Sequence, residues 1–134
     1  MGSKVKKSLF ILSILLLSSP VFGDKHKGET LFRWGECYDY KWMGFGEKDT
    51  HPVYKGQVKN GKPNGLGILT TPWGREYVGE WKDGRENGKG TFNYSNGMKY
   101  VGELKDGIWW NGTFYDQDGN ITKKYVNGKL EVKQ

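Results

Sequence analysis

The segment 77–99 reads YVGEWKDGRENGKGTFNYSNGMK, and the 23 residues before it, 54–76, read YKGQVKNGKPNGLGILTTPWGRE. The two copies align without a gap, and Tyr54, Tyr77 and Tyr100 follow one another at intervals of 23 residues. A fixed period of this length indicates a repeat architecture, in which each copy is one supersecondary unit that stacks on its neighbours. The sequence therefore predicts a chain of stacked repeats.

Each copy has the pattern of a single β-hairpin. In the second copy, Tyr77, Gly79 and Trp81 lie on one face by the two-residue period of a strand. Asp83 and Gly84 then supply a hairpin turn, because glycine accepts positive φ without a steric penalty. One hairpin alone is only marginally stable in water, so neighbouring copies must stabilise one another.

Glycines recur at the same steps of the first two copies, and the third copy keeps only Gly112 of their Gly-any-Gly pair, although glycine normally weakens a strand. We interpret this placement as room for an aromatic ring from the neighbouring hairpin. The residues expected to build the repeat are Tyr54, Gly56, Gly65, Gly67, Tyr77, Gly79, Trp81, Gly88, Gly90, Tyr100, Gly102 and Gly112.

The repeats predict the organisation of the chain. Three copies occupy 54–76, 77–99 and 100–120, of which the third is shorter, as terminal repeats often are. Residues 24–53 contain a fainter glycine pattern and are expected to form a capping segment with a degenerate repeat. Residues 121–134, with Tyr125 before an Asn-Gly pair, are expected to form a partial repeat and a basic tail.

These residues, above all YVGEWKDGRENGKGTF, closely resemble the MORN repeat family. The family's unit has Tyr, any residue, Gly, Glu and Trp, followed by a basic-Asp-Gly turn and a Gly-any-Gly pair. The resemblance implies an all-β fold, an elongated single-layer antiparallel meander of hairpins. It also implies use as a protein-binding scaffold or association with anionic lipid.

The first 23 residues have the composition of a signal peptide. Lys4, Lys6 and Lys7 precede an apolar run over 9–17, and cleavage is expected before Asp24. The alternative is an uncleaved membrane anchor, but a membrane span needs about 20 apolar residues and this run is shorter. We therefore expect an exported protein of the periplasm, cell envelope or extracellular space.

Charge and cysteine content narrow the classes of partner. Three of the 21 basic residues leave with the signal peptide and none of the 15 acidic ones, so the mature chain carries 18 basic and 15 acidic residues, a net charge of +3. That balance does not favour a nucleic-acid partner. Cys37 is the only cysteine, so no intramolecular disulfide forms; a buried strand position is favoured over a reactive thiol or a disulfide-linked dimer.

No constellation of catalytic or metal-binding residues is recognisable in the sequence. His26 and His51, the two histidines, have no neighbours with metal-ligand spacing. The stretch 116–120, DQDGN, invites a calcium hypothesis, but it lacks the further oxygen ligands of a calcium loop and is interpreted as a turn. We therefore expect neither a metal nor a cofactor, and no enzymatic activity.

The functional question is consequently about surfaces. Most aromatic residues are expected to hold one hairpin to the next, whereas Trp73, Trp109 and Trp110 are the candidate partner contacts. Trp109 and Trp110 are adjacent, so they point to opposite faces of a strand. The candidate lipid-facing residues of the tail are Lys123, Lys124, Lys129 and Lys133, although lysines that block pairing at an exposed edge are the preferred interpretation.

These features leave four classes of function. The leading hypothesis is a protein-protein interaction or scaffolding module at the cell envelope, followed by binding to an anionic membrane surface. Saccharide binding through exposed aromatic rings ranks third, and an enzyme ranks last. Uncovered end strands also suggest edge-to-edge homodimerisation.

Overall fold

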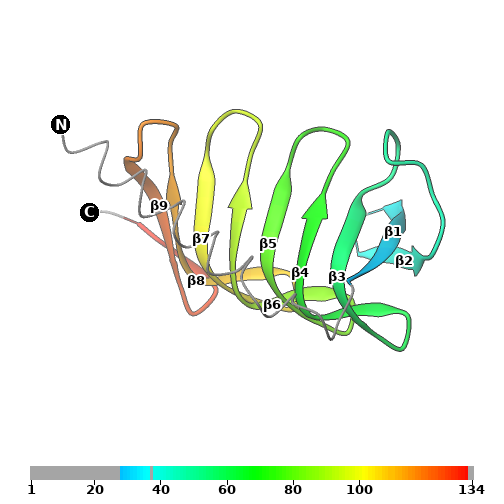
Figure 1. The fold of residues 1–134 in the computed structure, drawn as a ribbon. Helices are drawn as coiled ribbons and strands as arrows, with labels where there is room; N and C mark the ends of the chain where they lie inside the picture. Colours follow the sequence, from blue (N-terminus) through cyan, green and yellow to red (C-terminus); the bar gives the residue numbers. More distant parts are fainter. Residues whose placement is uncertain (1–27, 37, 133–134) are drawn as a thin grey trace.

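The computed structural model describes residues 28–36 and 38–132, which form one open antiparallel sheet (Figure 1). The predicted signal peptide, His26, Cys37 and Lys133 lie outside the described residues. The ten strands of the described part are β1 (Glu29–Glu36), β2 (Asp39–Met43), β3 (Val53–Lys59), β4 (Lys62–Thr70), β5 (Glu76–Lys82), β6 (Arg85–Asn93), β7 (Lys99–Lys105), β8 (Ile108–Tyr115), β9 (Ile121–Val126) and β10 (Lys129–Glu131). The predicted all-β hairpin fold is confirmed.

The strand order departs from a simple meander at one end. From β3 to β10 each strand pairs with the next one along the chain, so β3–β4, β5–β6 and β7–β8 are the hairpins of the three repeats. At the other end β1 lies between β2 and β3. The connection 44–52 returns the chain from the edge strand β2 to β3, past β1.

The turn inside each hairpin and the loop between successive hairpins recur from copy to copy. Within the hairpins, Asp83 and Gly84 have φ of 49° and 85°, and Asp106 and Gly107 have φ of 49° and 80°. Two successive residues with positive φ are typical of type I′ turns, whose twist matches that of the flanking strands. The predicted Asp-Gly turn therefore forms as expected.

The loops between hairpins are closed by backbone hydrogen bonds. The N–H of Tyr94 donates to Met98 O at 3.0 Å, and that of Asp116 donates to Asn120 O at 2.9 Å. In the second of these loops, Asp116 Oδ1 also accepts the N–H groups of Asp118 and Asn120, each at 2.9 Å. These hydrogen bonds lower the pKa of Asp116, with the Asn120 N–H as the largest cause. The stretch 116–120 therefore forms a turn, as interpreted from the sequence.

A cross-strand row of side chains forms most of the core. The registers pair its members one after another across β1 and β3 to β8, and all of them are buried: Leu31, Tyr54, Leu69, Tyr77, Phe92, Tyr100 and Phe114. Partners directly opposite in an antiparallel sheet lie on the same face. We call this side of the sheet the inner face. The core is therefore this row of side chains across seven strands, with Trp81 and Leu104 buried beside it.

The structure corrects the expected role of the glycines. A Cβ built on Gly67 would lie 2.2 Å from the ring of Tyr54, and one on Gly90 would lie 2.3 Å from the ring of Tyr77. Each tyrosine belongs to the same hairpin as the glycine, whereas we expected a ring from the neighbouring hairpin. The ring lies across its own hairpin because its hydroxyl donates to a main-chain oxygen three residues on, as Tyr77 does to Glu80 O at 3.0 Å.

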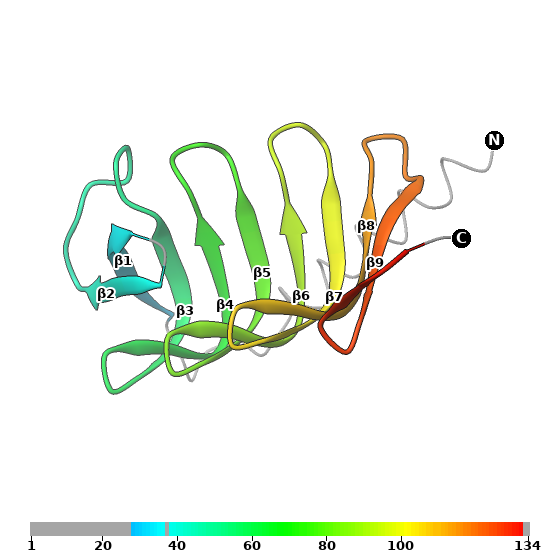
Figure 2. The ribbon, with the colours of Figure 1, turned by 180° about the vertical axis from the view of Figure 1, so that it is seen from behind.

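The tryptophan of the repeat supplies the contact between hairpins. Trp81 Nε1 donates to Gly67 O at 3.2 Å, and its ring lies 5.1 Å from Tyr54 and 5.3 Å from Tyr77. Figures 1 and 2 show that the strands bend toward their lower ends, so that the Asp-Gly turns project sideways and the sheet is curled. We infer that the curl lets a single-layer sheet bury aromatic rings on its inner face.

A second link between hairpins was missed in the sequence. Asn64, Asn87 and Asn111 each precede a glycine, and each side chain accepts an N–H from the turn of the next hairpin. The distances are 3.3 Å to Asp83 N, 3.2 Å to Asp106 N and 2.9 Å to Asn127 N. The recurring Asn-Gly dipeptide was the signal that could have revealed this ladder.

Candidate partner-binding surface

The N-terminal hairpin β1–β2 closes one end of the inner face. Trp42 Nε1 and Tyr40 Oη donate to Gly84 O at 3.1 and 3.2 Å, more than 40 positions along the chain. The Trp42 ring lies 5.9 Å from both Tyr54 and Trp81. Strand β2 thus covers the buried rings of Tyr54 and Trp81, which are not available to a partner.

Trp109 has the same packing role in the third repeat. It pairs with Leu104, and its ring lies 4.8 Å from Phe92, 4.5 Å from Tyr100 and 5.2 Å from Phe114. It is half-buried against the core, so we assign it to the scaffold rather than to a partner contact.

Trp110 also has packing partners. Lys105 Nζ lies 4.6 Å from the centre of its ring, and a Cβ on Gly128 would lie 2.8 Å from it. Trp110 therefore lies over the next turn and is half-buried. Both adjacent tryptophans are half-buried, so neither is as open to solvent as Trp73.

Trp73 is the candidate that the structure leaves open to solvent. It lies in the loop 71–75 between the first two repeats and is 60% exposed. The sequence did not identify Phe45, in the connection 44–52, which is likewise 60% exposed. Phe45 lies 5.6 Å from Trp34, whose ring in turn lies 3.9 Å from His51. Exposed aromatic residues thus gather at the N-terminal end of the sheet.

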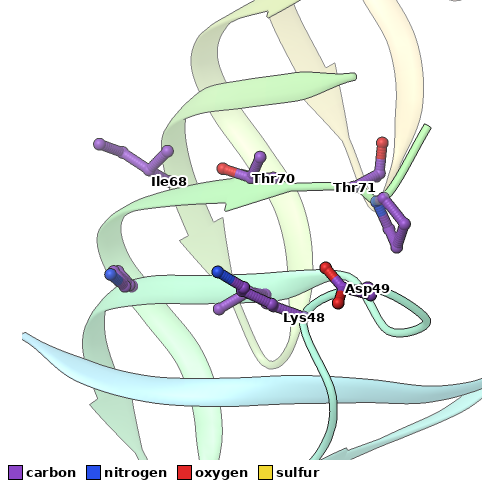
Figure 3. A pocket seen from close by; sticks show the side chains of 8 residues that line it. Lys48, Asp49, Ile68, Thr70 and Thr71 are labelled. Carbon is purple, nitrogen blue, oxygen red and sulfur yellow. The ribbon is translucent and has the colours of Figure 1, made fainter. Parts of the chain in front are cut away.

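The two loops that carry Trp73 and Phe45 also border a hollow of about 540 Å³. Figure 3 shows Lys48 and Asp49 of the connection on one side, and Ile68, Thr70 and Thr71 on the other. The complete lining is Lys48, Asp49, Val53, Lys55, Ile68, Thr70, Thr71 and Pro72. Apolar side chains flanked by two lysines and a carboxylate suit a contact with a side chain of a partner. We call this region, with Trp34, Phe45 and Trp73, the N-terminal surface.

The tyrosines of the repeats are held neutral by their surroundings. Burial raises the pKa of Tyr100 to about 12, and it raises the pKa of Tyr54 and Tyr77 further. Each hydroxyl donates a hydrogen bond to the backbone, as Tyr100 does to Glu103 O at 2.7 Å. These groups serve the fold, because their rings occupy the space over the glycines.

The lysines of the predicted tail do not lie on one face. Lys123 pairs with Phe114 of the inner face, whereas Lys124 pairs with Thr113 on the outer face. Lys129 pairs with Val126, also on the outer face. The structure therefore brings Lys124 and Lys129 to the same side and separates Lys123 from them.

Two further features bear on function within residues 28–36 and 38–132. No group of three or more His, Cys, Asp or Glu side chains in this part could hold a metal ion. The same part contains no helix that is long and apolar enough to cross a membrane.

A curled sheet of repeated hairpins that buries its own aromatic core defines an all-β repeat protein, which presents extended surfaces to its surroundings. The model of the MORN repeat family matches residues 54–74 and 77–99. The chain therefore contains MORN repeats at these positions. A comparison with curated proteins finds no match. MORN repeats are generally modules that interact with proteins or membranes, and the family is typically non-catalytic.

Proposed function

We propose that this protein is an exported, non-catalytic interaction module that binds a protein partner at the cell envelope through its N-terminal surface. The observation that carries the proposal is the contrast between buried and exposed aromatic residues. Rings of the repeats are buried in the core, whereas Phe45 and Trp73 are exposed on loops beside a hollow. Large exposed rings with few rotamers suit partner binding, because they bury much area at little entropic cost.

Export is the part of the proposal that depends on the sequence of 1–23. Its basic, apolar and small-residue segments follow the order of a secretory signal. Fractionation of cells that express the full chain tests this part independently. Recovery of a shortened chain, starting near Asp24, from the envelope or the medium is expected, and retention of the full-length chain in the cytoplasm would contradict it.

The partner is tested by capture from solubilised membrane and soluble envelope fractions, with the protein as exported. A double substitution, Phe45→Ala with Trp73→Ala, is expected to reduce capture of a specific protein about 10-fold or more, as for two contacts of about 1 kcal/mol each. The matched control is Ile108→Ala, which removes a comparably exposed apolar side chain elsewhere on the sheet. Equal capture by all three proteins would contradict the proposed surface.

The second candidate is binding to an anionic membrane surface. It is favoured by Lys124 and Lys129, which share the outer face with the exposed Val126. Vesicles that contain phosphatidylserine should then sediment the protein at low salt and release it at high salt. Sedimentation that is lost on Lys124→Glu with Lys129→Glu, but unchanged by Phe45→Ala with Trp73→Ala, would assign the function to the membrane.

A further inference from the structure

We propose that the strand β10 joins a second copy of the chain, by antiparallel pairing of Lys129-Leu130-Glu131 with the same three residues of the second copy. This inference concerns the end of the sheet opposite the N-terminal surface, and it does not depend on the proposed partner. In the described part of the chain, β10 is paired on one side only, with β9.

The register of the terminal hairpin determines which groups face the free edge. Val126 pairs with Lys129 across the turn of Asn127 and Gly128, whose φ values are 49° and 79°. In such a two-residue hairpin the pair next to the turn exchanges both hydrogen bonds, and the next pair, Tyr125 with Leu130, does not. The N–H and C=O of Leu130 therefore point away from β9.

A two-fold axis at Leu130 satisfies these groups. The Leu130 N–H of each copy would donate to the Leu130 oxygen of the other, as in a hydrogen-bonded antiparallel pair. The flanking positions become non-hydrogen-bonded pairs, in which side chains approach most closely. The interface is isologous, so the association closes at two copies.

Charge complementarity singles out the second copy as the occupant. In this register Lys129 lies opposite Glu131 of the other copy, and Glu131 lies opposite Lys129. Lys129 and Glu131 share the outer face of the sheet, because their partners in β9 are Val126 and Lys124. Opposite charges directly across an antiparallel pair are favourable, whereas like charges are not. The triplet Lys-Leu-Glu is thus complementary to itself.

The inner face supports the same arrangement. Phe114 lies 6.0 Å from Tyr125, which is half-buried against the core, but the next residue along this face, Leu130, is 48% exposed. In the dimer Leu130 packs against its copy and the core continues into a second sheet. A paired edge of three residues predicts a weak dimer rather than an obligate one.

The test is a charge swap, measured by analytical ultracentrifugation of the purified protein from about 1 µM to about 1 mM, a range that covers weak association. Lys129→Glu places two like-charged pairs at the interface and should weaken the dimer roughly 10- to 30-fold. Glu131→Lys should do the same. Lys59→Glu, an exposed lysine in β3, changes the net charge equally and should leave the dimer intact.

Complementation makes the test specific for the register. A mixture of Lys129→Glu with Glu131→Lys restores opposite charges across the interface and should form a heterodimer. The double variant should form a homodimer with wild-type affinity. A monomer at all concentrations, assembly beyond two copies, or no rescue by mixing would overturn the proposal. Unchanged circular dichroism shows that the exposed substitutions leave each variant folded.

Discussion

The two ends of this sheet finish the same inner-face core in different ways. At the N-terminal end the hairpin β1–β2 is attached through β1, and Trp42 of β2 covers the rings of the first two repeats. At the other end β9–β10 simply continues the meander, and Leu130 is left half-exposed.

The difference shows what a stack of hairpins needs at its ends. A repeat protein buries each unit against its neighbours, so a terminal unit needs a special cap or a partner molecule. The N-terminal end has a cap made from the chain itself. The C-terminal end has an edge whose charges complement a second copy, which is why we place self-association there.

The largest expected effect comes from removing the cap. Trp42→Ala should lower the free energy of unfolding by about 3 kcal/mol, because it removes a packed indole and its hydrogen bond to Gly84 O. Leu130→Ala at the opposite end should cost less than about 1 kcal/mol in the monomer, since Leu130 is half-exposed. Urea unfolding of both variants checks the difference. Equal losses would show that the two ends are equally closed.

The second test concerns the space over the glycines in the three repeats, between the two ends of the sheet. Gly90→Ala should cost about 2–3 kcal/mol, because its Cβ would lie 2.3 Å from the ring of Tyr77, which is 1% exposed. Gly44→Ala is the matched control, since a Cβ there meets nothing within 4 Å. Thermal unfolding measures both. A small effect at Gly90 would mean that the tyrosine moves aside at little cost.

The third test uses pH to probe the burial of the repeat tyrosines on the inner face of the sheet. The folded pKa of Tyr100 is raised to about 12 from an ordinary value of 10, so the neutral form is favoured in the folded state. The stability from this group is fully present below pH 10 and is lost as pH rises toward 12. We expect a loss of up to about 1.4 kcal/mol per pH unit for each such tyrosine.

Tyr100→Phe separates this group from the others. The variant should show a shallower loss of stability between pH 10 and pH 12 than the wild type in urea unfolding, although its starting stability is lower because the hydrogen bond to Glu103 O is gone. Parallel slopes for the two proteins would contradict the proposed burial of the Tyr100 hydroxyl.

The smallest expected effect concerns the asparagine ladder. Asn111→Ala removes the acceptor for Asn127 N and should destabilise the terminal hairpin by about 1 kcal/mol. Asn64→Ala removes the equivalent acceptor for Asp83 N and should loosen only the Asp83-Gly84 turn of the second hairpin. Amide exchange of β9 should accelerate in the first variant and remain unchanged in the second. The reverse pattern would show that the ladder does not link adjacent hairpins.

The repeat itself could be predicted from the sequence, because its signals are local. Positive φ in Asp83-Gly84 and the two-residue period around Tyr77 depend only on neighbouring residues. The 23-residue spacing then requires one sheet of stacked hairpins. Sequence reasoning therefore reached the fold class, but it missed the asparagine ladder and placed each tyrosine ring on the wrong hairpin.

Other features depend on contacts between distant residues and could not be predicted. The position of β1 between β2 and β3 depends on Trp42 reaching Gly84, far along the chain. Trp109 packs inward because a register shift in β7–β8 pairs it with Leu104. Phe45 has no repeat pattern to mark it as exposed. The N-terminal surface depends on how the connection 44–52 and the loop 71–75 lie in the folded chain.

Amide hydrogen exchange resolved by residue shows most directly whether the core is closed at its N-terminal end and open at its C-terminal end. It is best measured on Lys129→Glu, in which self-association should be weakened. We expect the strongest protection in β3 to β8, with protection retained in β1 and falling by at least about 10-fold in β9 and β10. Equal protection at both ends, or a β1–β2 hairpin that exchanges faster than β9–β10, would contradict it.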